Sequence, residues 1–208
     1  PIPSRGLGDV YKRQGETMDT IAATELLKEN GAHVLALVNV VGSSLARMAG
    51  SVFYLHVGPE IGVASTKAYL GMLVGQLLLA KHWDSANKLD VSFDEIAELP
   101  KLIEQTMACE KQIKDISEKI YKKNDIYFIG RGLDYALAAE GALKLKEISY
   151  LHAEALAAGE LKHGTLALIE DGTPIIVTAS QNHLLDKTTS NVQEVIARGA
   201  YVIAIGDN

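Results

Sequence analysis

The chain has 208 residues, of which 48% are hydrophobic and 22% are charged, and its net charge is −6. Such a chain can bury a sizeable core in one or two domains. The negative charge, the few aromatic residues and the lack of a Lys/Arg cluster argue against a nucleic-acid-binding protein. The most apolar stretch, Ala68 to Ala80, is far shorter than the ~20 residues that a bilayer requires, so we expect no membrane insertion.

The single cysteine, Cys109, cannot form an intramolecular disulfide, which fits a reducing cytoplasm. Its place on an amphipathic helix argues against a catalytic role. The first fourteen residues, PIPSRGLGDVYKRQ, contain two prolines, two glycines and three basic residues without a sustained period. We therefore expect residues 1–14 to be a non-native or disordered lead.

From Gly15 the chain alternates between helix and strand. The continuous apolar run His33 to Val40 is typical of a parallel strand buried on both faces. Gly71 and Gly75 lie one turn apart on a predicted helix, where another helix could approach closely. The first module, residues 15–91, is predicted to contain helices over 17–30, 43–48 and 66–82 and strands over 33–40 and 51–57.

The polar stretch Asp84 to Ser92 marks a domain boundary. Apolar residues at helical spacing then predict one long linking helix within residues 92–122. The second module, residues 123–208, is predicted to contain strands over 126–129, 175–179 and 201–205 and helices over 134–150 and 183–198. This alternation predicts right-handed βαβ units. The expected fold class is therefore α/β, with three αβα layers in which parallel sheets are flanked by helices.

The segment Glu140 to Gly164 is helix-forming and rich in ionisable residues. Glu140, Lys144 and Glu147 fall at i, i+4 and i+7, so they project from one helix face. A carboxylate beside a lysine, together with a histidine, is suited to proton transfer next to a carbonyl. The same stripe is also typical of a solvated helix face held by ion pairs.

A metal site is a further alternative for the polar residues of this segment. Its ligands would be His152, Glu154, Glu160 and His163. Their spacing lacks the i, i+4 histidine pair of zinc helices, so we expect no metal and no other cofactor.

Six strings, spread in order over residues 15–208, carry a family resemblance: GET-x-DT, EIGVASTKAY, GRG, EGALKLKEISY, HAEA and GELKHG. Together they resemble the isomerase half of the glutamine–fructose-6-phosphate aminotransferase family. That half is built from two flavodoxin-like sugar isomerase (SIS) domains. The resemblance implies the carboxyl part of one SIS domain in residues 15–91 and the amino-terminal part of another in residues 123–208.

The resemblance also implies an activity. The family converts fructose 6-phosphate and glutamine-derived ammonia into glucosamine 6-phosphate, a precursor of UDP-N-acetylglucosamine. It implies a cytoplasmic homodimer in the full-length protein, with a sugar phosphate as its small-molecule partner.

By the family's pattern, Thr17 contacts the phosphate, and three residues line the sugar site: Glu60, Val63 and Ser65. On local grounds Ser65 is equally suited to capping the helix that follows, and the two roles can coexist. Glu147 would move the proton between C1 and C2, with Lys144 balancing the charge. His163 would open the sugar ring from the neighbouring subunit, although a histidine in a loop can also be structural.

The chain departs from the family pattern in its phosphate loop. Lys12, Arg13 and Gln14 stand where the family has Ser-Gln-Ser. The family's Schiff-base lysine lies close to its carboxyl terminus, beyond the position of Asn208, and its glutaminase domain is not in this sequence. We therefore expect the 208-residue chain alone to be inactive.

Two other functions fit the same residues. A ketose/aldose phosphosugar isomerase without nitrogen transfer could use Glu147 and His163 as a proton shuttle. An SIS-type regulator could bind a sugar phosphate without catalysis, but it would have no need for both residues.

Overall fold

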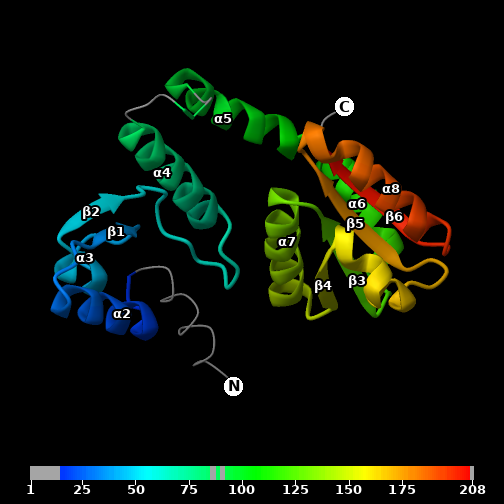
Figure 1. Ribbon diagram of the computed structural model, residues 1–208, viewed down its shortest axis with the longest axis horizontal. Coiled ribbons are helices and arrows are strands. Elements are labelled where there is room, and N and C mark those ends of the chain that lie inside the picture. The colour runs from blue at the N-terminus through cyan, green and yellow to red at the C-terminus, as the bar shows by residue number, and fades with distance from the viewer. Residues whose placement is uncertain (1–14, 85–87, 90–91, 207–208) are drawn as a thin grey trace. The chain divides into compact units, whose positions relative to one another are not determined.

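The computed structural model describes residues 15–84, 88–89 and 92–206. The expected lead, residues 1–14, lies outside them. The chain divides into two compact units, Pro1–Ala108 and Cys109–Asn208 (Figure 1). Each unit is described by itself.

Unit 1 alternates helices and strands from Gly15 onward. Its elements in chain order are α2 (Met18–Glu29), β1 (Leu35–Val38), α3 (Ser44–Met48), β2 (Ser51–Tyr54), α4 (Lys67–Trp83) and α5 (Phe93–Met107). The strands β1 and β2 pair in parallel, with Leu35 opposite Ser51. All predicted helices and strands are present, although both strands are shorter than expected because their flanking residues leave the ladder.

Local residue choices explain where these helices begin. The Ser43 hydroxyl accepts a hydrogen bond from the Ala46 N–H at 3.3 Å and so caps α3. Ser92 and Glu95 form a reciprocal capping box at the start of α5. The helix α2 ends before Gly31, whose φ of 80° lies in the left-handed region.

The glycines of α4 pack on strands rather than on a helix. A Cβ atom at Gly71 would lie 2.7 Å from Cγ1 of Val57, and one at Gly75 would lie 3.3 Å from Phe53 and Leu37. The close approach that these glycines predict is present, but β1, β2 and the residues after β2 occupy this face instead of a helix. The glycines let α4 lie close to the sheet.

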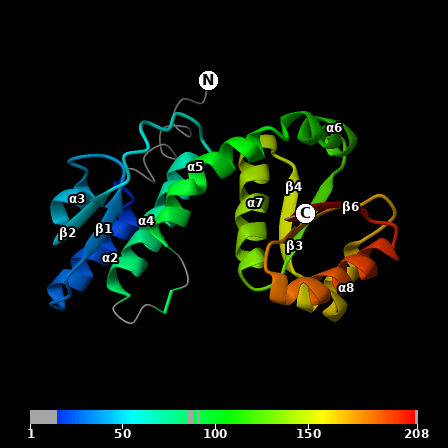
Figure 2. The same ribbon diagram turned by 90° about the horizontal axis from the view of Figure 1, so that it is seen from above.

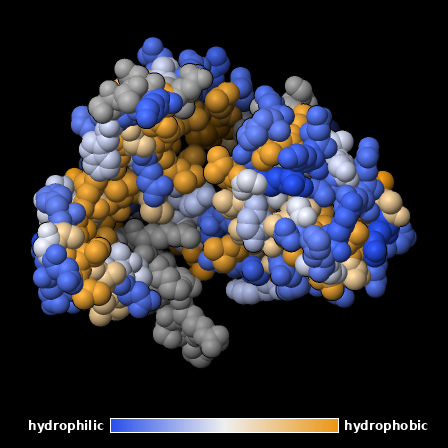
Figure 3. Space-filling view, viewed as in Figure 1, coloured by the Kyte–Doolittle hydropathy of each residue, from blue (hydrophilic) through white to orange (hydrophobic). Residues whose placement is uncertain are grey.

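An apolar pocket of about 630 Å³ lies among β2, α4 and α5. It is lined mainly by aliphatic side chains of the two helices, with Lys67 as its charged residue. Figure 3 shows hydrophobic residues gathered over the same two helices.

Unit 2 has a four-stranded parallel sheet in the order β4-β3-β5-β6. Its elements in chain order are α6 (Glu110–Ile120), β3 (Asp125–Gly130), α7 (Leu133–Ser149), β4 (His152–Ala157), β5 (Pro174–Ala179), α8 (Leu185–Ile196) and β6 (Tyr201–Gly206). Three 3₁₀ turns complete it: η1 (Ala158–His163), η2 (Thr165–Leu168) and η3 (Asn182–Leu184).

Helices cover both faces of this sheet (Figure 2). Side chains of β3 alternate between the two faces, as the period of a strand requires. Ile126 and Phe128 pack with α7 and Ile120 of α6. Tyr127 and Ile129 pack with Val195 of α8 in the larger core cluster on the other face. This three-layer arrangement confirms the predicted fold class.

Two expectations for the middle of the chain were wrong. The single long helix within residues 92–122 is two helices, α5 and α6, separated at Ala108 and Cys109. No strand was expected after α7, yet β4 follows it directly. Tyr150 has a φ of 60° and ends α7, and β4 then pairs with β3.

Candidate functional site

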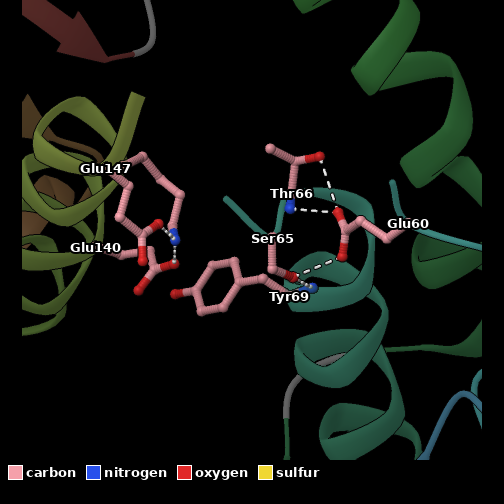
Figure 4. Close-up of polar contacts among 7 residues, drawn as sticks. Glu60, Ser65, Thr66, Tyr69, Glu140 and Glu147 are labelled. Carbon is pink, nitrogen blue, oxygen red and sulfur yellow. Dashed lines mark hydrogen bonds and ion pairs between the residues drawn. The ribbon is translucent and has the colours of Figure 1, made fainter. Parts of the chain in front are cut away.

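In unit 2, three charged side chains meet on one face of α7. Lys144 Nζ lies 2.5 Å from Oε2 of Glu147 and 3.4 Å from Oε1 of Glu140. Figure 4 shows both glutamates pointing outward from α7. The predicted i, i+4, i+7 stripe is therefore present as one lysine between two carboxylates.

The three side chains are half-buried rather than solvated. Their exposed fractions are 21% for Glu140, 17% for Lys144 and 29% for Glu147. The opposite face of α7 packs on the sheet through Ala138 and Ala142. The stripe is thus less exposed than an ordinary surface ion pair, and its charges interact more strongly because water screens them less.

Glu140 has one carboxylate oxygen that makes no hydrogen bond with the described residues. Oε1 of Glu140 is buried and accepts none within the described residues, although it lies beside the Lys144 ammonium. A buried oxygen of this kind can accept a hydrogen bond from a donor that arrives with a ligand.

His163, the other predicted proton carrier, ends the η1 turn. Its side chain is exposed, and it makes no hydrogen bond or ion pair with any described part of unit 2. The structure therefore does not bring His163 into contact with the α7 stripe. The adjacent Gly164 has a φ of 143°, which a side-chain-bearing residue would adopt only with strain.

In unit 1, the predicted sugar-site residues Glu60 and Ser65 are in contact. The Ser65 hydroxyl donates a hydrogen bond to Oε2 of Glu60 at 2.8 Å, and the Thr66 N–H donates to Oε1 at 2.6 Å (Figure 4). The Tyr69 N–H in turn donates to the Ser65 hydroxyl at 3.2 Å. Ser65 is buried at 3% exposure, so the loop before α4 is tied closely to the first turn of the helix.

The hydrogen bonds from Ser65 and Thr66 favour the ionised form of Glu60. Partial burial would raise the pKa of its carboxyl, but hydrogen bonds from Thr66 and Ser65 outweigh that effect and hold the pKa below its usual 4.5. Glu60 is therefore an ionised acceptor at the amino end of α4, where the helix dipole also favours a negative charge. The N-cap residue of α4 is Thr66 rather than Ser65, although the Ser65 hydroxyl accepts a hydrogen bond from Tyr69 in the first turn. Thr66, the third member of this group, is not among the residues predicted from the sequence.

Val63 and Thr17 complete the predicted set. Val63 is 51% exposed in the loop between Glu60 and Ser65, and Thr17 is the N-cap residue of α2. Nearby, Oε1 of Glu16 accepts a hydrogen bond from the Ser44 N–H at 2.7 Å. Hydrogen bonds from Ser44 lower the pKa of Glu16. The start of α2 is thereby tied to the start of α3.

The metal alternative is not supported by the described residues. Among them, no three His, Cys, Asp or Glu side chains gather at a distance suited to a metal ion. His152 pairs instead with Asp125, at 2.7 Å between Nδ1 and Oδ1. Within the same residues, no helix is long and apolar enough to cross a membrane.

A comparison with known protein families matches residues 10–81 and 119–208 to the SIS domain model. The glutamine–fructose-6-phosphate aminotransferase (isomerizing) of Pyrococcus horikoshii is 46% identical over 209 residues. That alignment covers 100% of this chain and 35% of the relative, so the chain spans about a third of the relative's length.

Two solved structures are similar to this chain. The C-terminal domain of glucosamine-fructose-6-phosphate aminotransferase from Francisella tularensis has a TM-score of 0.81 at 40% identity. The match covers 94% of this chain and 57% of that one. A putative phosphosugar isomerase from Silicibacter pomeroyi has a TM-score of 0.77 at 28% identity, covering 92% of this chain and 57% of that one.

Proposed function

This chain belongs to the SIS domain family, and from that premise we propose that it supplies the isomerase part of an enzyme that makes glucosamine 6-phosphate. The substrates are fructose 6-phosphate and ammonia released from glutamine. The names of the Pyrococcus horikoshii and Francisella tularensis proteins support this reaction. The observation that carries the proposal is the half-buried Glu140–Lys144–Glu147 stripe, because proton transfer beside a carbonyl requires a positioned carboxylate and a nearby cation to balance the charge that develops.

In this proposal Glu147 is the base that moves a proton between C1 and C2 of the open-chain sugar. The Lys144 ammonium, 2.5 Å away, offsets the negative charge that develops on the substrate. A Schiff base at C2 makes the C1 proton acidic, since its electrons can move towards nitrogen. We assign the amine of that Schiff base to no residue of this chain.

Sugar binding is assigned to unit 1. Glu60 is an ionised acceptor for sugar hydroxyls, Ser65 holds it in place, and Val63 offers an apolar contact. Thr17 contacts the phosphate at the start of α2, where the backbone N–H groups of the first helical turn and the helix dipole favour an anion. His163 opens the ring from the neighbouring subunit, which agrees with its exposed side chain.

The remaining parts of the proposal concern the full-length protein. We propose a homodimer that acts in the cytoplasm on small molecules and binds no nucleic acid. The dimer follows from the assignment of His163 to the neighbouring subunit's site. The net charge of −6 supports the exclusion of nucleic acid.

A second candidate is a phosphosugar isomerase without nitrogen transfer. The similarity to the Silicibacter pomeroyi protein favours it. Both candidates need Glu147 and His163, but only the first needs ammonia. Interconversion of sugar phosphates without ammonia, at a rate equal to or above amination, would favour the second.

The test uses a full-length chimera in which residues 15–208 replace the matching segment of the Pyrococcus horikoshii enzyme. In this chimera Glu147→Gln keeps the helix and the side-chain shape but removes the basic lone pairs. We expect kcat for glucosamine 6-phosphate formation to fall about 10²–10⁴-fold, with KM for fructose 6-phosphate nearly unchanged.

Glu154→Gln is the matched control for this test. Glu154 is an exposed acidic residue of β4 in the same unit. Equal losses in the two variants, or a loss confined to KM, would place Glu147 among the substrate-positioning residues instead.

A further inference from the structure

The η1 turn, which carries His163, packs against the core of unit 2 through two buried side chains. Ala158 and Leu161 are fully buried in the core cluster that also contains Val195 of α8. Glu160, Lys162 and His163 are exposed. The two buried side chains hold η1 against the core. The orientation of its exposed side is then set by polar contacts.

The first such contact comes from Arg131, in the turn after β3. Its Nη1 donates a hydrogen bond to Oδ1 of Asn191 on α8 at 2.7 Å. Its backbone carbonyl accepts a hydrogen bond from Gln181 at 2.8 Å. The guanidinium lies against Gly159: a Cβ atom at that position would be 3.2 Å from Nη2. The arginine side chain therefore packs against the first residues of η1.

The second contact comes from Glu194, one turn beyond Asn191 on α8. Its Oε2 accepts a hydrogen bond from Nδ2 of Asn191 at 3.4 Å, and its Oε1 lies 2.9 Å from Nζ of Lys162. Lys162 directly precedes His163. A continuous polar chain, Arg131–Asn191–Glu194–Lys162, thus links both ends of η1 to α8.

The inner residues of this polar network are more buried than those of an ordinary surface ion pair. Asn191 is 7% exposed and the Glu194 side chain is 17% exposed, whereas the Lys162 side chain is 66% exposed. A network whose inner members are buried holds one geometry, because an unmade hydrogen bond inside the protein is costly.

We propose that Arg131, Asn191 and Glu194 are positioning residues that hold η1 so that His163 can transfer its proton. This inference rests on the proposed function, which assigns ring opening to His163. Proton transfer needs hydrogen-bond reach, and a displacement of about 1 Å can cost about 10²-fold in rate. None of the three residues has to touch the substrate.

The test compares Arg131→Met with Arg198→Met in the full-length chimera. Methionine keeps the length of the side chain and removes the guanidinium, and Arg198 is an exposed arginine of the same unit. We expect Arg131→Met to lower kcat by about 10–100-fold with KM for fructose 6-phosphate unchanged, and Arg198→Met to change neither constant. Arg131→Lys should recover part of the loss.

Hydrogen exchange of the same chimeras measures how readily the turn opens to solvent. Amides of residues 159–164 should exchange faster in Arg131→Met, while those of β3 and β5 keep their protection. If β3 and β5 also lose protection, Glu194→Gln is measured instead. It keeps an acceptor for Asn191 and releases only Lys162, and it should show the same local loosening with a several-fold loss of kcat.

A double variant separates positioning from a general structural role. In a His163→Asn chimera, adding Arg131→Met should lower kcat no further, because the network acts through the histidine. Multiplying losses would overturn the proposal, as would unchanged exchange of residues 159–164 in both variants. If His163→Asn alone leaves kcat unchanged, the ring-opening assignment fails, whatever the exchange data show.

Discussion

Among the described residues of unit 2, Asp134 is the most deeply buried acidic residue, at 1% exposure. It accepts hydrogen bonds from the N–H and the hydroxyl of Ser180, the latter at 2.6 Å. Burial would raise the pKa of its carboxyl, but the hydrogen bonds from Ser180 and Gln181 outweigh it and hold the pKa below the usual 3.8. The ionised carboxylate thereby joins the start of α7 to the end of β5.

This shift predicts how the stability of unit 2 depends on pH. Between the pKa of folded Asp134 and 3.8, the unfolded state binds more protons, so the free energy of unfolding falls as pH decreases through this window. The contribution is fully present above 3.8. Urea unfolding of the wild-type chain and of Asp134→Asn, from pH 6 to pH 2.5, measures it.

The wild-type protein should lose more stability than Asp134→Asn over the acid part of that range. Asp186→Asn, on the exposed side of α8, should keep the wild-type pH dependence. Parallel curves for the wild type and Asp134→Asn would contradict the prediction.

At the scale of elements, the junction between β3 and α7 depends on one glycine. A Cβ atom at Gly130 would lie 2.4 Å from the backbone carbonyl of Asp134 and 2.7 Å from the Thr178 hydroxyl. These backbone atoms cannot move aside by a change of rotamer, as a flexible side chain can. The first turn of α7 would have to move away from the sheet.

We therefore expect Gly130→Ala to destabilise unit 2 by about 3 kcal/mol, at the upper end of typical overpacking costs. Denaturant unfolding followed by circular dichroism measures the difference. Gly62→Ala serves as the control, since its Cβ would have only an ordinary contact, 3.6 Å from the Ala64 carbonyl. A wild-type midpoint for Gly130→Ala would show that α7 shifts without cost.

Periodicity predicted most elements because their signals are local. The apolar runs gave β3, β5 and β6, and the helical spacing gave the α7 stripe whose ion pairs the structure confirms. The strand β4 was missed because HAEALA is rich in helix formers. Its signal was the alternation of exposed His152 and Glu154 with buried Ala153, which has the period of a strand.

Contacts between distant segments could not be predicted in this way. The stripe of Gly71 and Gly75 predicts close approach without showing what approaches, and strands lie there where a helix could have packed. The Arg131–Asn191 bond joins residues 60 positions apart and leaves no periodic signal. Thr66 joined the Glu60 and Ser65 group only through the fold of the loop before α4. The catalytic and binding assignments themselves stay predictions.

At the scale of the whole molecule, we expect the 208-residue polypeptide alone to form no glucosamine 6-phosphate, even with added ammonia. It spans about a third of the length of the Pyrococcus horikoshii relative, and no residue in it is assigned as the Schiff-base amine. Product can be followed by mass spectrometry, with a boiled sample as control. Product above that control would show that a lysine of this chain supplies the amine.

The strand order β4-β3-β5-β6 also bears on how unit 2 folds during synthesis. The strand β3 is made first, yet it pairs with β4 on one side and with β5 on the other, where Tyr127 lies opposite Ile175. One edge of β3 therefore stays unpaired until β5 has been synthesised, which happens after β4 has been made. Such non-local pairing slows folding and leaves an open edge available to other chains. The emerging sheet therefore keeps an open edge on β3 even after β4 has paired, and this edge closes only when β5 arrives.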